Sequence, residues 1–220
     1  RDIFITTVDF HPATGDLDFR TFGGDDGGRR TARKLVRDPL LPESVLVAGS
    51  LEGRMVFGNV GVDAFESGES AYLLSVIAPI AEPPRETNLE LLNHMVLGAE
   101  SLEVVALEAN GRVHVAGHAR GDLSAVIGGA AATVVAPATG CQRDAFLLSM
   151  RDFAMPSVDR CGDGDQLSGD IGLSLLDQQD EAIWGLNLPA GSVINAGPRH
   201  LDQTPLEGSS AIFLYPHMLR

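Results

Sequence analysis

Four aspartates in the C-terminal half of the chain have the spacing of a calcium-binding loop. Asp159, Asp163, Asp165 and Asp170 stand at the first, fifth, seventh and twelfth positions of one stretch, and Gly164 stands where such a loop turns sharply. Carboxylate oxygens are the ligands that calcium prefers in proteins. The spacing therefore makes calcium a possible cofactor of this chain.

The same stretch departs from the calcium pattern at two positions. Cys161 stands at the third position, where an oxygen ligand is usual, and Gln166 stands at the eighth, where an aliphatic residue is usual. Carboxylates so close together repel one another, and either a bound cation or exposure to solvent must relieve that repulsion. A solvent-exposed Gly/Asp turn without metal is the alternative interpretation.

A histidine, an aspartate and a glycine-flanked turn also follow one another along the chain. They are His94, Asp122 and the turn from Gly169 to Gly172, with Ile171 inside it. Nucleophilic hydrolysis by a histidine base needs these parts, namely the base, a carboxylate that orients it and a nucleophile on a tight turn. Ile171 has neither a hydroxyl nor a thiol, so this set lacks the nucleophile.

In this order of residues, and in the strand around Trp184 after the turn, the chain resembles the trypsin-like serine peptidases of the chymotrypsin fold. The resemblance covers roughly residues 45–220. It implies a catalytically inactive domain that acts as a binding module, with His94, Asp122 and Ile171 as a degenerate catalytic set. The alternative for His94 is a half-buried residue of a helix, as described below.

His114, His118 and Asp122 lie four residues apart along one predicted strand, so they have the same parity and all three can share a face. Two imidazoles and a carboxylate are a possible zinc set. Gly117 and Gly121 are expected to interrupt the strand, and residues four apart on a strand are about 13 Å from each other, which exceeds one metal shell. We therefore expect a solvated strand face here.

Composition narrows the classes of partner. A net charge of -14 repels phosphate backbones and anionic lipids, so we expect neither nucleic-acid binding nor membrane insertion. The nearest basic cluster, residues 29–37, is short and follows Asp25 and Asp26.

Cys141 and Cys161 are the only cysteines, and the sequence leaves open whether they form a disulfide. The chain starts at Arg1, so an N-terminal segment removed by processing is possible.

Short apolar runs separated by turn residues predict a mainly β fold, an antiparallel sandwich or barrel. The predicted strands are residues 3–8, 45–48, 54–60, 72–80, 102–108, 112–116, 131–136, 145–150, 182–188 and 211–215. A hairpin is expected across Asn110 and Gly111, because both tolerate the positive φ of a tight turn. A second hairpin is expected to join residues 45–48 to 54–60 through Gly53.

One short helix is predicted near residues 88–97. Thr87 and Glu90 have the spacing of a capping box, and Leu91, Leu92, Met95 and Val96 then form one apolar face. We expect Gly98 to end this helix.

Residues 1–43 are assigned to an N-terminal arm and residues 44–220 to a β-rich domain. The arm combines the apolar run from Ile3 to Val8 with the Gly/Asp-rich stretch from Gly23 to Gly28, which cannot pack a core. Such an arm can supply its first strand to the sheet edge of a neighbouring subunit.

These features favour a non-catalytic structural subunit of a larger assembly, such as a virion shell, tail or exported coat. Its expected partners are copies of itself or other assembly subunits, in an extracellular or virion location. The alternatives are the inactive trypsin-like binding module and a calcium-stabilised extracellular module.

Overall fold

The computed structural model of the protein describes residues 3–8, 17–22, 28–38, 40–41, 43–57, 59–77, 90–110, 112–138, 144–154, 156–161, 171–176, 181–189 and 210–218. Neighbouring strands in these ranges all pair antiparallel, and the ranges contain no helix. The predicted class, a mainly β antiparallel sandwich, is therefore confirmed, and the predicted helix is wrong.

Two sheets form the sandwich. The larger has six strands, in the order β12 (Thr133–Ala136), β11 (Leu123–Ile127), β8 (Glu90–Ala99), β7 (Glu69–Ile77), β4 (Ser44–Leu51) and β3 (Arg30–Arg37). The smaller has four strands, in the order β14 (Ser157–Cys161), β13 (Asp144–Met150), β10 (Arg112–Arg120) and β9 (Ser101–Asn110).

The main hydrophobic core lies between these two sheets. Leu73 and Met95 contribute to it from the six-stranded sheet, and Val115 and Phe146 from the four-stranded sheet, all at most 1% exposed. Apolar side chains at alternate positions of each strand point into this space, as expected for two sheets packed face to face.

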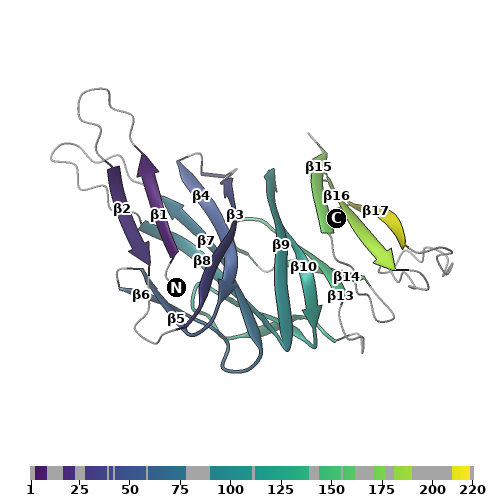
Figure 1. The fold of residues 1–220 in the computed structure, drawn as a ribbon, viewed down its shortest axis with the longest axis horizontal. Coiled ribbons are helices and arrows are strands. Elements are labelled where there is room, and N and C mark those ends of the chain that lie inside the picture. The colour runs from purple at the N-terminus through teal and green to yellow at the C-terminus, as the bar shows by residue number, and fades with distance from the viewer. Residues whose placement is uncertain are drawn as a thin grey trace.

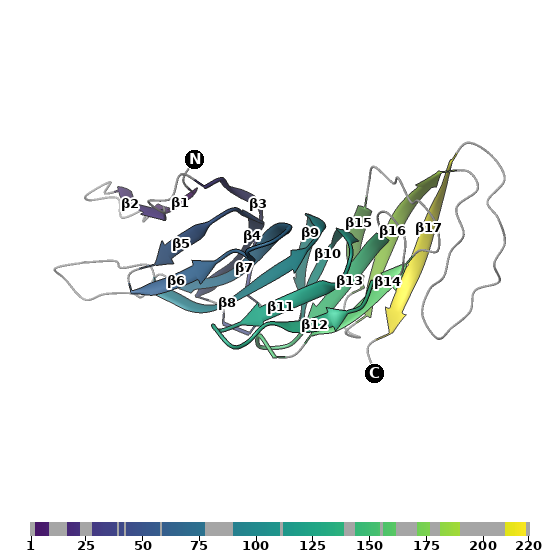
Figure 2. The same cartoon turned by 90° about the horizontal axis from the view of Figure 1, so that it is seen from below.

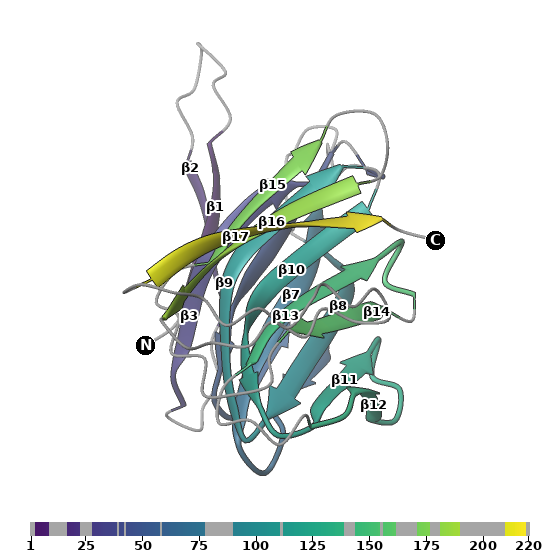
Figure 3. The same ribbon diagram turned by 90° about the vertical axis from the view of Figure 1, so that its right-hand side faces the viewer.

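Further layers cover the outer faces of both sheets (Figures 1 and 2). The hairpin of β5 (Arg54–Phe57) and β6 (Val60–Asp63) covers the six-stranded sheet, where Met55 and Val62 pack against Tyr72 and Leu74 in a second core. A three-stranded sheet lies over the four-stranded one, with its first strand against β9 and β10 (Figure 3). Its strands are β15 (Ile171–Leu176), β16 (Glu181–Pro189) and β17 (Ser210–Met218).

The sandwich is open at its sides and does not close into a barrel. The edge strand β3 of the larger sheet approaches the edge strand β9 of the smaller sheet, and β12 approaches β14 in the same way. In neither case do the two strands share a ladder of hydrogen bonds. The two sheets therefore keep separate edges.

The segment predicted as a helix forms the strand β8. Met95 and Leu97 face the core between the sheets, whereas Val96 faces the β5–β6 hairpin on the other side. A strand buried on both faces carries apolar residues at successive positions, which also satisfies the spacing of an amphipathic helix. Thr87, the predicted cap, lies outside the described residues.

The hairpin predicted across Asn110 and Gly111 is confirmed, because β9 and β10 pair antiparallel with Asn110 opposite Arg112. The hairpin predicted around Gly53 is wrong. β4 pairs with β3 and β7, whereas β5 pairs with β6. The turn at Gly53 (φ 76°) instead takes the chain out of the large sheet and over its outer face.

Within the predicted arm, β1 (Ile3–Val8) pairs with β2 (Leu17–Phe22) and approaches β3. β3 itself belongs to the large sheet through its pairing with β4. The arm hypothesis therefore concerns the residues before β3, and docking of β1 onto a neighbouring subunit stays a prediction.

Candidate functional site

An open cleft of about 1390 Å³ lies where β3 and β4 face the start of β9. Its walls come from distant parts of the sequence, namely β3, the β4–β5 turn, the segment between β6 and β7, and β9. Most of the side chains that line it are charged or hydroxylated. The cleft is thus a polar site at one end of the sandwich.

The floor of the cleft depends on a close contact across Gly49. The Tyr72 hydroxyl donates a hydrogen bond to the Thr31 carbonyl oxygen at 3.0 Å, crossing β4 at Gly49. A Cβ on Gly49 would lie 1.7 Å from that carbonyl oxygen and 2.7 Å from the hydroxyl. Only glycine therefore allows this crossing. Burial raises the pKa of Tyr72 well above its ordinary value.

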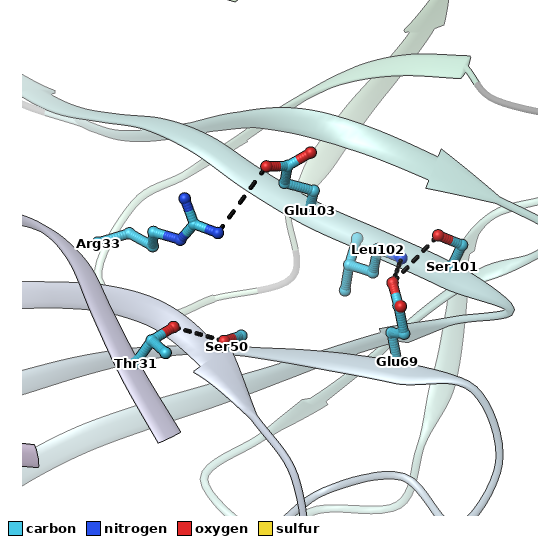
Figure 4. A network of polar contacts seen from close by, with 7 residues as sticks. All are labelled: Thr31, Arg33, Ser50, Glu69, Ser101, Leu102 and Glu103. Atoms are coloured by element: carbon cyan, nitrogen blue, oxygen red, sulfur yellow. Dashed lines mark hydrogen bonds and ion pairs between the residues drawn. The ribbon is translucent and has the colours of Figure 1, made fainter. Parts of the chain in front are cut away.

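Glu69 fixes the wall on the β9 side (Figure 4). Its Oε2 accepts hydrogen bonds from the Leu102 backbone N–H at 2.7 Å and from the Ser101 hydroxyl at 3.0 Å. Gly68 precedes it in a left-handed backbone conformation (φ 83°), which residues other than glycine rarely adopt. The turn before β7 therefore holds the first residues of the four-stranded sheet.

Charged pairs cross the cleft and its rim. Arg33 Nη2 lies 3.9 Å from Glu103 Oε1, which joins the two facing edges (Figure 4). Arg54 Nε lies 3.4 Å from Asp63 Oδ1 on the β5–β6 hairpin. Hydrogen bonds and charges of both signs suit this cleft to binding a polar segment or ligand.

The structure does not bring His94 and Asp122 together. The His94 carbonyl oxygen accepts a hydrogen bond from Gly128 N–H after β11, whereas Asp122 lies before β11 and accepts one from Ala138 N–H at 2.6 Å. Gly128, which contacts His94, and Asp122 are six residues apart along this strand, or roughly 20 Å. Burial lowers the pKa of His94.

Ile171 is also distant from His94. It begins β15, which lies over the outer face of the four-stranded sheet. His94 shares its strand parity with Val96, whose cluster lies on the opposite side of the six-stranded sheet. The two residues are therefore on different layers of the structure.

Of the predicted calcium ligands, Asp159 lies in β14 opposite Leu147. Asp163, Asp165 and Asp170 lie outside the described residues, as does Cys141, so calcium binding and the disulfide stay predictions. Cys161 ends β14 opposite Ala145. Across the residues that the structure does describe, no three His, Cys, Asp or Glu side chains form a possible metal site.

The strand face of His114 and His118 is buried, so the expectation of a solvated face is wrong. The two side chains are 0% and 2% exposed, and His114 Nδ1 lies 2.8 Å from the Ser149 hydroxyl. β15 lies against the strands on this face, which accounts for the burial. Asp122 lies beyond the end of the strand and is exposed, after Gly121 turns the chain with a φ of 78°.

Sequence reasoning missed the cleft because its walls come from distant parts of the chain. Glu69 and Ser101 are 32 residues apart and meet only through the pairing of β7 with β8. The basic run at residues 29–37 was the one local signal, and the structure places it on β3 beside the cleft.

Comparison with protein-family models, with curated proteins and with solved structures finds no match to this chain. In the described part of the chain, no helix has the length and apolar character needed to span a membrane.

Proposed function

We propose that the protein is a non-catalytic structural subunit that self-associates through the edges of its sheets. The observation that carries the proposal is the exposed edge strand β3. Leu35 on this strand is 59% exposed, the highest value among the large apolar side chains whose burial the structure describes. Arg33 and Lys34 beside it are exposed as well.

An edge strand offers backbone N–H and C=O groups to another chain. β3 pairs with β4 on one side, and no described strand forms a ladder with its other side. An exposed leucine on such an edge gives an incoming chain an apolar contact in addition to hydrogen bonds. Edge contacts of this kind suit the repeated subunits of a virion shell, tail or exported coat.

Cationic side chains and an irregularity also protect this edge from unspecific pairing. The register of β3 on β4 shifts between Ala32 and Lys34, and bulges of this type discourage the addition of an arbitrary strand. Like charges also keep two β3 edges apart. The edge therefore selects a partner surface of opposite charge.

The proposal is tested by sedimentation velocity of the full chain and of Leu35→Ser, over a range of micromolar concentrations. We expect the full chain to form larger species as concentration rises and Leu35→Ser to form fewer of them. Leu92→Ser is the matched control, because Leu92 is 41% exposed on β8, which β7 and β4 separate from β3 in the same sheet. A full chain that stays monomeric throughout would overturn the proposal.

A further inference from the structure

We infer that the edge strand β12 pairs with β12 of a second copy of this chain, so that the large sheets of the two copies join into one. β12 lies at the margin of the sandwich beside β11 (Figure 3). β11 forms a ladder with one side of β12, and no described strand forms a ladder with its other side. The contact is separate from the one proposed at β3 and goes beyond it.

β12 is an uncharged edge on a strongly charged protein. Residues 123–142 form the longest stretch of the sequence without Asp, Glu, Lys or Arg. The other three edge strands of the sandwich all carry charges: β3 has arginines and a lysine, β9 has two glutamates, and β14 has an aspartate and an arginine. Proteins often place charges on an exposed edge to keep other chains away. β12 lacks that protection.

Val134 gives this edge an exposed apolar side chain. It is 54% exposed, and Ala132 and Thr133 before it are exposed as well. Ala125 on β11 faces the main core, so Ser124 next to it and Val134 opposite Ser124 face outward. An incoming strand can therefore reach both the backbone of this edge and a β-branched side chain.

A second copy of β12 fits this edge by symmetry. Two antiparallel strands related by a twofold axis normal to the sheet place one residue opposite itself. With Val134 at that position, each valine covers the other, and pairs of β-branched side chains stabilise antiparallel strands. Like charges opposite each other are destabilising, which disfavours the same arrangement for β3, β9 and β14. The absence of charge thus favours β12 as the edge that meets its own copy.

The negative charge of Asp122 lies at one end of this edge. Its carboxylate accepts a hydrogen bond from Ala138 N–H, four residues beyond Val134. In the antiparallel pair the two Asp122 side chains belong to opposite ends and lie on the order of 20 Å apart. That separation exceeds the screening length of about 10 Å at 0.1 M salt, so the two carboxylates do not prevent pairing.

The contact is small. The register of β12 on β11 skips Val135, and Pro137, which has no N–H, follows the strand. A short contact gives dimers that dissociate on dilution. The net negative charge of both copies opposes the pair, and added salt screens that repulsion. The β12 dimer should therefore persist in high salt, whereas larger species that need the charged β3 edge should diminish.

The test is sedimentation velocity of the full chain carrying Leu35→Ser, which removes the apolar contact of the β3 edge. Val134→Lys or Val134→Glu, added to this chain, places two like charges opposite each other in the pair. Val56→Lys is the matched control, because Val56 is 39% exposed on β5, in the layer over the outer face of the large sheet. Both valines are exposed, so the chain should fold with each substitution, and circular dichroism checks this.

We expect the Leu35→Ser chain to form dimers at low salt, and Val134→Lys or Val134→Glu to weaken them about tenfold. A mixture of the Lys and Glu variants should dimerise again, because opposite charges then face each other across the pair. The control should dimerise as strongly as the Leu35→Ser chain.

Three outcomes would overturn the inference. Normal dimers of Val134→Lys would show that β12 makes no contact, and a mixture that stays monomeric would show that the two valines do not meet. Equal weakening by Val56→Lys would show an effect of net charge alone.

The failure of this inference is distinct from the failure of the contact proposed at β3. A Leu35→Ser chain that is monomeric where the unmodified chain associates would overturn the β12 contact and leave the β3 contact standing. A Leu35→Ser chain that associates as the unmodified chain does, and becomes monomeric with Val134→Lys, would do the opposite.

Discussion

Arg33 and Glu103 lie 3.9 Å apart, one on each of the two sheet edges that flank the cleft. Their side chains are 57% and 43% exposed, so water and salt screen the attraction. Such a pair contributes about 0–1 kcal/mol to stability. Its position matters more than its strength, because it marks the point where the basic edge of the large sheet meets acidic residues of the small one.

Glu69 should matter more to stability than its exposed neighbours. Replacing it with alanine leaves the Leu102 N–H without its acceptor and should lower the free energy of unfolding by about 1–2 kcal/mol. Glu66→Ala, in the same connection, is the control and should change it by less than about 0.5 kcal/mol. Urea denaturation of the two variants measures the difference. Equal midpoints would show that Glu69 does not hold the start of β9.

Gly68→Ala should be far more costly than Gly129→Ala. Both glycines have positive φ, so alanine costs about 1–2 kcal/mol at either from backbone strain. At Gly68 the new Cβ would also lie 2.1 Å from the Ala99 carbonyl oxygen, whereas at Gly129 nothing lies within 4 Å. Thermal denaturation of the two variants isolates the effect of the contact between the new Cβ and the Ala99 carbonyl oxygen. Similar melting temperatures would argue against this turn geometry.

Tyr72 should make the protein less stable in alkaline solution. Burial raises the pKa of Tyr72, so above about pH 10 the unfolded chain releases a proton that the folded chain retains. The free energy of unfolding should therefore fall as the pH rises through that range. Tyr72→Phe should cost about 1 kcal/mol at neutral pH, because the Thr31 carbonyl oxygen loses its donor.

The same variant tests the cause of this pH dependence. Phenylalanine cannot ionise, so Tyr72→Phe should lose less stability than the unmodified protein between neutral pH and about pH 10.5. Urea denaturation at both pH values measures the two differences. Identical losses would assign the alkaline effect to other groups.

The residues before β3 give a separate prediction about assembly. β1 and β2 pair with each other, so deletion of residues 1–22 removes a complete hairpin and no strand of the two large sheets. We expect the shortened chain to fold but to self-associate less, because β1 no longer reaches the sheet edge of a neighbour. Circular dichroism checks the fold, and sedimentation velocity checks the association.

Two results would contradict that prediction. A shortened chain that unfolds would show that the first strand belongs to the core of its own chain. One that folds and associates as the full chain does would show that the arm has no part in assembly. Ile5→Ser in the full chain is a second test of the arm. It makes the first strand less apolar but keeps the length of the chain.

Sequence patterns predicted one of the two expected hairpins correctly and predicted burial poorly. Asn110 and Gly111 specify a tight turn by their own backbone preferences, and the hairpin across them forms as predicted. β8 was mistaken for a helix because its burial depends on two layers from other parts of the chain. Its apolar residues are consecutive for that reason, and no local preference distinguishes this pattern from a helical face.

The candidate site was beyond local patterns for a related reason. The Glu69 carboxylate becomes an acceptor for Leu102 N–H only after β7 and β8 have paired. His114 and His118 were expected in water, but both are buried on a face that β15 approaches. Contacts between distant segments thus decide both the cleft and the buried histidines, whereas the sequence marks only the basic run of β3.

Sedimentation velocity of the unmodified full chain, at rising protein concentration and at low and high salt, tests the central claim most directly. Self-association through a charged sheet edge predicts species larger than the monomer that grow with concentration and diminish as salt is added. A single monomeric species at every concentration in low salt would contradict it.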